Sequence, residues 1–181
     1  MENFTFAWLD RETYEGYPLK FSYRTDRHYR VTASQWSMSL REETFPESAE
    51  KAFTDELFGD WLEAPVALGA FLGEELAGVI EGSVETWHNV FRISNLLIME
   101  PYRKAGLGTA LMDRMLAHAK SLGCRGAILE TQSCNYPAIS FYRKQGFTLS
   151  RIDLREYHND DILRGEVRLD FFLAFSQQKE G

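Results

Sequence analysis

The sequence is poor in cysteine and in long hydrophobic runs. Its two cysteines, Cys124 and Cys134, are too few for a disulfide framework, and no spacing of cysteine and histidine indicates a zinc site. The most apolar run, residues 64–73, has about half of the ~20 residues that a membrane-spanning helix needs. No apolar segment of a secretory signal follows the N-terminus. These absences predict a cytoplasmic, reduced protein that holds no metal and does not associate with membranes.

Basic residues are also scarce relative to acidic ones. The chain of 181 residues has 20 Lys and Arg against 27 Asp and Glu, a formal net charge of −7, which makes it a poor non-specific ligand for nucleic acid. Residues 41–86 hold 12 acids and two bases, whereas residues 101–125 hold five bases and one acid. The first stretch could meet a cation and the second an anion. On charge alone, two solvated faces are the preferred interpretation.

The apolar content is sufficient for one globular domain over residues 1–181, since 44% of the residues are hydrophobic. Apolar spacing predicts one or two strands within 29–38 and a helix over 46–62. Further along the chain we expect a hairpin of strands 64–72 and 76–84, a strand at 91–99, an amphipathic helix at 107–122, a strand at 126–131, a helix from 135 to about 145, and strands at 149–152 and 167–175. This order predicts an α/β fold whose mixed sheet has one parallel βαβ unit at its centre.

A glycine turn, Arg103-Lys104-Ala105-Gly106-Leu107-Gly108, lies between the strand at 91–99 and the helix at 107–122. Glycine lets a ligand approach the backbone closely, and the N–H groups of a helix start face an anion. The turn therefore indicates a phosphate site, although a tight strand–helix turn is an equally good explanation of the glycines alone. It is not a P-loop, because no Gly-Lys-Ser/Thr follows.

A second motif, Asn-x-x-Ala-x-x-Phe-Tyr-x-x-x-Gly-Phe, runs from Asn135 to Phe147. Together with the Arg-x-x-Gly-x-Gly of the glycine turn about thirty residues earlier, it resembles the GNAT family of acyl-CoA-dependent N-acetyltransferases. The resemblance is firm over residues 91–151. It implies a single GNAT-like domain with a mixed central sheet flanked by helices and splayed at the acetyl-CoA site, and acetyl-CoA as co-substrate.

The resemblance also implies residue roles. It implies that the pyrophosphate of the cofactor is bound by the backbone N–H groups of Arg103, Lys104, Ala105, Gly106, Leu107, Gly108 and Thr109. The end of the preceding strand, Leu97, Ile98 and Met99, pairs with the pantetheine arm. Asn135 contacts the pantetheine, and Tyr142 protonates the departing thiolate. Without the resemblance, Tyr142 would be assigned to the core, because it shares a helix face with Ala138 and Ile139.

Within the family, Leu129-Glu130-Thr131-Gln132 followed by Asn135 is similar to the streptothricin acetyltransferases, which acetylate an amino group of a cationic antibiotic. Those enzymes tend to carry a Glu-Asp pair on the strand before the glycine turn. The aligned positions here are Ser94 and Asn95, and neither side chain can act as a base. The base and the acceptor therefore stay open.

An alkylamine has a pKa near ~10, so a group on the protein must accept a proton before the amine can attack. The candidates for this base are Glu81, on the neighbouring strand, and Glu130, at the end of the central strand. Glu81, Glu85 and Glu130 are also the candidates for binding the acceptor. A buried structural acid that holds a backbone N–H or an arginine is an equally good assignment for Glu130, and Cys134 is interpreted as a packing residue.

The sequence thus predicts an acetyl-CoA-dependent N-acetyltransferase for a small cationic amine, with a streptothricin-type antibiotic as the sharpest candidate. A polyamine, an aminoglycoside and a peptide amine are the alternative acceptors. The alternative of another class is a non-catalytic acyl-CoA-binding protein. A homodimer is one candidate assembly.

Overall fold

The computed structural model describes residues 3–176 and has an α/β architecture. Seven strands form a mixed sheet in the order β1-β4-β5-β6-β7-β9-β8, and two further strands form a separate sheet, β2-β3. The chain divides into two compact units. The first unit holds the residues up to Phe21, Thr54–Ile128 and the residues from Ala174 onward, and the second unit holds Ser22–Phe53 and Leu129–Leu173.

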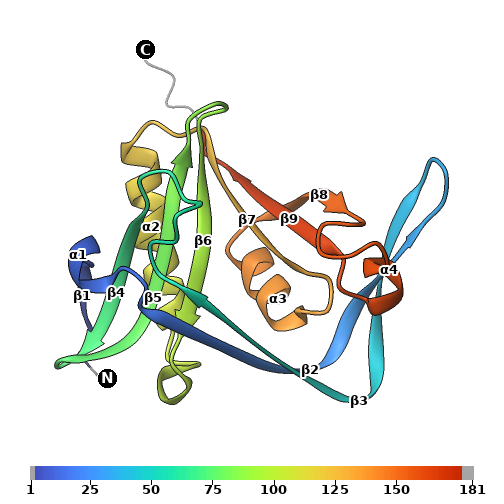
Figure 1. Cartoon of the computed structure of the whole chain (residues 1–181), viewed down its shortest axis with the longest axis horizontal. Helices are drawn as coiled ribbons and strands as arrows, with labels where there is room; N and C mark the ends of the chain where they lie inside the picture. The colour runs from blue at the N-terminus through green and yellow to red at the C-terminus, as the bar shows by residue number, and fades with distance from the viewer. Residues whose placement is uncertain (1–2, 177–181) are drawn as a thin grey trace. The chain divides into compact units, whose positions relative to one another are not determined.

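The first unit contains most of the sheet. Its elements are β1 (Thr5–Trp8), α1 (Arg11–Tyr14), β4 (Val66–Leu72), β5 (Glu75–Glu85), β6 (Val90–Ile98), a single 3₁₀ turn η1 (Glu100–Tyr102) and α2 (Leu107–Ser121). Strands β1, β4, β5 and β6 pair antiparallel in that order, and α2 packs against β4, β5 and β6 (Figure 1). The apolar stripe that predicts this helix is the buried face, because Leu111, Met112 and Met115 are completely buried.

Strand β7 (Gly126–Gln132) begins in the first unit and ends in the second. The second unit continues with α3 (Tyr136–Lys144), β8 (Thr148–Asp153), α4 (Asp161–Arg164) and β9 (Arg168–Ala174), and β8 pairs antiparallel with β9. The predicted hairpin, the strands flanking α2, both long helices and the two final strands are confirmed to within about two residues at each end.

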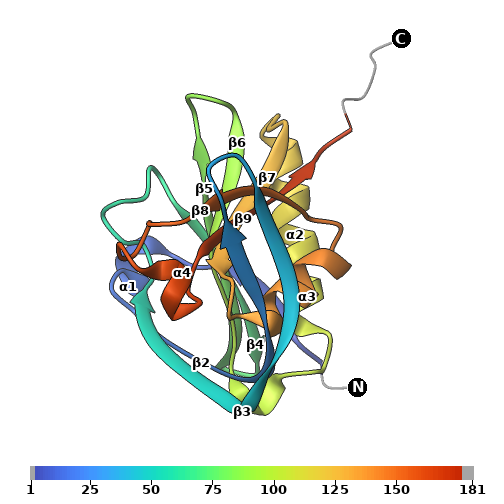
Figure 2. The ribbon, with the colours of Figure 1, turned by 90° about the vertical axis from the view of Figure 1, so that its right-hand side faces the viewer.

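The helix predicted over residues 46–62 is wrong. Residues 18–33 and 38–56 instead form β2 (Pro18–Ala33) and β3 (Met38–Glu56), two strands that run side by side (Figure 2). Basic β2 and acidic β3 pair their charges, with Arg27 Nη1 at 2.9 Å from Glu42 Oε1 and Arg30 Nη1 at 3.8 Å from Glu43 Oε2. Within β3 the apolar side chains of this spacing are not buried together, since Phe53 is half exposed, whereas Leu57 and Phe58 are buried only beyond the end of the strand. Cross-strand pairing therefore decides the conformation here, rather than the helical pattern.

The longest helix in the described chain is α2, with 15 residues, and no helix there has both the length and the apolar character to span a bilayer.

Candidate active site

The glycine turn of the first unit joins β6 to α2. Lys104 has a φ of 67° and Gly106 a φ of 81°, so the chain turns through two left-handed residues before the helix begins. Gly106 occupies the N-cap position, where no side chain caps the helix, and a Cβ built on it would meet no protein atom within 4 Å. The N-terminal end of α2 is therefore open to an anion, and the helix dipole favours one there.

The end of β6 is tied to the same turn. The Met99 N–H donates to the Ala77 carbonyl at 2.9 Å, and Arg103 Nε donates to the Ile98 carbonyl at 3.2 Å. On the neighbouring strand, a Cβ at Gly78 would lie 2.8 Å from Ile98 Cδ1 and 3.1 Å from the Leu97 carbonyl oxygen. Glycine is therefore required at position 78 if the end of β6 is to keep its place in the sheet. The structure brings Leu97, Ile98, Met99 and the predicted turn, Arg103–Thr109, together in one stretch of the first unit.

A β-bulge interrupts the pairing of β5 with β6. Glu81 pairs with Asn95 and Gly82 pairs with Ile93, so Ser94 is the extra residue of β6. Both side chains that replace the expected acids reach Glu81: Asn95 Nδ2 donates to Glu81 Oε2 at 2.9 Å and Ser94 Oγ donates to the same oxygen at 3.2 Å. The carboxylate missing from β6 is thus supplied from the adjacent strand.

Glu81 is completely buried in the first unit. Its second oxygen, Oε1, accepts the Phe58 N–H at 2.6 Å. Burial raises the pKa of the Glu81 carboxyl, and the hydrogen bonds from Asn95, Phe58 and Ser94 act against that rise. A carboxyl whose pKa is moved toward neutrality suits proton transfer.

Replacing Glu81 tests this environment. Glu81→Ala should lower the free energy of unfolding by roughly 3 kcal/mol, because the buried Phe58 N–H loses its acceptor and a cavity opens. Glu81→Gln retains an acceptor oxygen and should remain within about 1.5 kcal/mol of wild type. Since the native state holds the Glu81 proton more tightly than the unfolded state, wild type should lose stability relative to Glu81→Gln as the pH rises from the ordinary glutamate range through the raised native pKa. Urea unfolding at several pH values measures both effects, and a pH-independent difference would contradict the shift.

Glu85, the third predicted acid, is paired within the first unit. It forms an ion pair with Arg92, and His88 Nε2 lies 3.2 Å from Glu85 Oε2. Its charge is therefore already balanced by neighbours on the same strand pair, unlike that of Glu81.

In the second unit, Asn135 caps α3. Its side-chain oxygen accepts the Ala138 N–H at 3.3 Å, as the capping pattern predicts. Ser133, two residues earlier, is completely buried: its N–H donates to the Val167 carbonyl and its hydroxyl to the Gly165 carbonyl. The hydrogen bonds of Ser133 therefore fix the chain before Asn135, and the cap fixes the chain after it.

Tyr142 lies on α3 and is partly buried. Its ring packs against Phe141, Phe147 and Phe171, with ring centroids 5.8–6.3 Å apart. Burial, together with the negative charge of Glu130, raises the pKa of the Tyr142 hydroxyl to about 12. The phenol is therefore protonated throughout the neutral range and can act as a hydrogen-bond donor.

Glu130 pairs with Arg168, a residue that the sequence analysis does not single out. Arg168 on β9 forms an ion pair with Glu130 and also binds Glu156 and Asp170. The ordinary signal of such a pair, an acid and a base at fixed spacing, is absent because the two residues are 38 positions apart. The alternative assignment of Glu130, an acid that holds an arginine, therefore describes a contact that exists.

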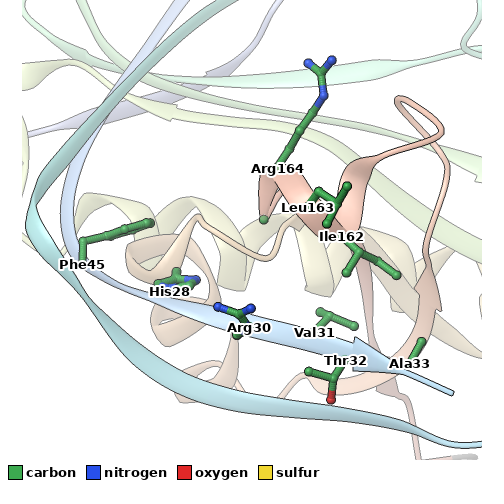
Figure 3. A pocket seen from close by; sticks show the side chains of 10 residues that line it. His28, Arg30, Val31, Thr32, Ala33, Phe45, Ile162, Leu163 and Arg164 are labelled. Atoms are coloured by element: carbon green, nitrogen blue, oxygen red, sulfur yellow. The ribbon is translucent and has the colours of Figure 1, made fainter.

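A pocket of about 440 Å³ lies in the second unit between β2, β3 and α4 (Figure 3). His28 stacks on Phe45 at its wall, with ring centroids 4.3 Å apart, and no lining residue is acidic. Its two arginines are already paired, Arg30 with Glu43 and Arg164 with Asp160, and the Arg164 side chain extends away from β2. This lining therefore offers no carboxylate to an ammonium group. Within residues 3–176, no His, Cys, Asp and Glu side chains form a group of three or more that could hold a metal ion.

The comparison with protein families assigns the chain. The model of the Acetyltransferase (GNAT) family matches residues 7–147, a span that includes β6, the glycine turn, α2 and the Asn135 motif. The chain belongs to the GNAT family of acetyltransferases. This confirms the predicted family, whose activity is the transfer of an acetyl group from acetyl-CoA.

Several relatives carry more specific names. The chain is 37% identical to a streptothricin acetyltransferase of Escherichia coli over 110 residues, which are 61% of this chain and 63% of that protein. It is 26% identical to a streptothricin acetyltransferase of Streptomyces lavendulae over 156 residues, 82% of each chain. The first match thus spans less than two thirds of the length of the E. coli relative.

Solved GNAT structures share the whole fold. A crystal structure of nourseothricin acetyltransferase superposes with a TM-score of 0.73 at 27% identity, covering 94% of this chain and 98% of the other. A protein from Bacillus anthracis str. Ames, solved in complex with acetyl coenzyme A, superposes with a TM-score of 0.75 at 22% identity, covering 97% and 99%. The predicted GNAT-like α/β fold is confirmed, and acetyl-CoA is the co-substrate seen bound in that structure.

Proposed function

We propose that this protein transfers the acetyl group of acetyl-CoA to a primary amine of a small cationic acceptor, with a streptothricin-type antibiotic as the first candidate. The observation that carries the proposal is the family match over residues 7–147, together with an open, uncapped helix start at the glycine turn. The streptothricin acetyltransferases among the relatives support the acceptor class.

We assign the cofactor to residues that the resemblance names. Backbone N–H groups of Arg103–Thr109 hold the pyrophosphate, and Leu97–Met99 pair with the pantetheine. We also assign Asn135 to the pantetheine and the Tyr142 hydroxyl to the leaving sulfur. The open space above Gly106 supports the first assignment, and the raised pKa of Tyr142 supports the last.

We assign the base to Glu81, reached through Ser94. Glu81 is completely buried and cannot meet the amine directly, whereas Ser94 is partly exposed and donates its hydroxyl proton to Glu81. A proton of the ammonium form of the amine first passes to the Ser94 oxygen while the Ser94 proton moves to Glu81. The neutral amine nitrogen then bonds to the thioester carbon and the C–S bond breaks. The second proton that the nitrogen loses goes to the departing sulfur, to which Tyr142 donates a hydrogen bond.

We assign binding of the acceptor's positive charge to Glu130 rather than to Glu85. Glu85 already forms an ion pair with Arg92 of β6, and His88 of the turn between the two strands lies beside it. Glu130 pairs with Arg168, and the same guanidinium also pairs with Glu156 and Asp170. An ammonium group beside Glu130 would add positive charge where one guanidinium is shared by three acids.

Conversion of acetyl-CoA to free thiol in the presence of an amine panel tests the proposal. The panel holds streptothricin, a polyamine, an aminoglycoside and a peptide with a free N-terminus. Faster thiol release with a cationic amine, matched by an acetylated product in mass spectrometry, is the expected result. Acetyl-CoA binding with no acetylated product from any amine would favour the non-catalytic acyl-CoA-binding alternative.

The acceptor assignment predicts a difference between two matched variants. Glu130→Gln should lower kcat/KM for the best amine by roughly tenfold to over a hundredfold, since a charge-assisted hydrogen bond contributes ~1.5–3 kcal/mol. Glu85→Gln should change it by less than about threefold, because its charge is neutralised by its neighbours. Steady-state kinetics with the amine varied at saturating acetyl-CoA measures both, and equal losses would contradict the assignment.

A further inference from the structure

Arg168 is the centre of an ion-pair network within the second unit. Each of its three nitrogens meets a different acid: Nη2 pairs with Glu130, Nη1 lies 2.5 Å from Glu156 Oε1, and Nε lies 2.8 Å from Asp170 Oδ1. These acids come from separate elements, β7, the loop before α4, and β9. One guanidinium therefore fixes three parts of the unit relative to one another.

The centre of the network is shielded from water, whereas the side chains of Glu130 and Glu156 are 34% and 39% exposed. The side chain of Arg168 is 15% exposed and that of Asp170 is completely buried. Although burial works against its charge, Asp170, Glu130 and Glu156 raise the pKa of the Arg168 guanidinium, which stays charged at all working pH values. Ion pairs in such surroundings are weakly screened, so loss of the arginine leaves its acids poorly compensated.

The network also extends to residues of the proposed reaction. Glu130 is the acid assigned to the acceptor, and its charge acts on the hydroxyl of Tyr142, the group assigned to the leaving sulfur. Arg168 and Asp170 are two residues apart on the same face of β9, whereas Phe171, on the opposite face, packs against the Tyr142 ring. Arg168 therefore reaches the reaction through Glu130 and not by direct contact with Tyr142.

We propose that Arg168 is a positioning residue that orients the Glu130 carboxylate for the ammonium group of the acceptor. The role rests on the proposed function. Only an arginine supplies several donors in a rigid plane, so that Glu130, Glu156 and Asp170 are held at once, whereas lysine offers a single point charge. The acceptor meets a carboxylate of fixed direction, and the affinity for acetyl-CoA is not affected.

A double-mutant cycle between Arg168→Gln and Glu130→Gln tests the role. If Arg168 acts through Glu130, Arg168→Gln should raise the KM for the best amine by roughly tenfold to a hundredfold and change kcat and the KM for acetyl-CoA by less than about threefold. In the Glu130→Gln background, the same change should add less than about threefold. Arg168→Lys, which keeps the charge without the fork, should recover part of the lost affinity.

Arg151→Gln is the matched control. Arg151 Nη1 lies 3.4 Å from the other oxygen of Asp170 and its side chain is largely exposed, so its replacement removes a positive charge from the same buried acid. It should leave the acceptor KM near that of wild type. Circular dichroism establishes that each variant is folded, and Arg168→Lys, which keeps a positive charge beside Asp170, takes the place of Arg168→Gln in the cycle if Arg168→Gln alone unfolds.

The outcomes separate the two proposals. Additive effects of Arg168→Gln and Glu130→Gln in an active enzyme, or an equal rise in the KM for acetyl-CoA, would overturn the positioning role and leave the proposed function standing. A wild-type protein that acetylates none of the amines would overturn the proposed function and this role with it.

Discussion

Replacing Gly106 with valine should weaken acetyl-CoA binding by roughly 10²–10⁴-fold. The left-handed Gly106 has nothing of the protein within 4 Å of where a Cβ would stand, so an added side chain occupies the space that we assign to the pyrophosphate. Loss of two hydrogen bonds from backbone N–H groups to a charged phosphate, each contributing ~1.5–3 kcal/mol, produces an effect of this size. Isothermal titration calorimetry with acetyl-CoA measures it.

Gly123→Val is the matched control for Gly106→Val. Gly123 follows the other end of α2, has a φ of +76°, and likewise has nothing within 4 Å of an added Cβ. Both substitutions impose similar backbone strain, on the order of 1–3 kcal/mol, so both should lower thermal stability to a similar degree. Only Gly106→Val should lose the cofactor, and wild-type affinity in a folded Gly106→Val would contradict the phosphate assignment.

Tyr142→Phe should lower kcat by roughly tenfold to over a hundredfold and leave acetyl-CoA affinity unchanged. The ring still packs against Phe141, Phe147 and Phe171, and only the hydroxyl is lost. The hydroxyl pKa of about 12 against ~8.5 for a thiol opposes complete proton transfer by roughly 5 kcal/mol. Tyr142 therefore acts chiefly as a hydrogen-bond donor to the thiolate, and the loss belongs near the lower end of the ~10²–10⁴-fold that general acids contribute.

The pH profile gives a second test of Tyr142. Because burial and Glu130 keep its hydroxyl protonated up to a pKa of about 12, Tyr142 does not titrate between pH 6 and pH 9. Tyr142→Phe should lower the whole kcat profile without moving either limb in that range, as stopped-assay thiol release at fixed pH values would show. Tyr136→Phe, which removes a hydroxyl from the same helix, is the control. If the two variants had equal rates, Tyr142 would be a packing residue of the core and not a donor to the thiolate.

The sequence alone determined the part of this protein whose structure depends on near neighbours. The apolar stripe of α2, the strands on either side of it, Asn135 as the cap of α3 and the left-handed Gly106 are local features, because each is fixed by residues within about one or two turns of the chain. The two motifs that identify the GNAT family lie in these same segments, which is why the family could be predicted before the structure was known.

Only the tertiary structure decided which acids have partners. Residues 46–56 follow a helical pattern yet form β3, because a basic strand lies beside them. Ser94 and Asn95 stand where two carboxylates were expected, but the register of β5 against β6 brings the carboxylate of Glu81 to both side chains. Arg168 meets Glu130 from 38 residues away. Such contacts depend on strand register and on burial, which raises the free energy of an unpaired charge, and neither quantity is a property of local sequence.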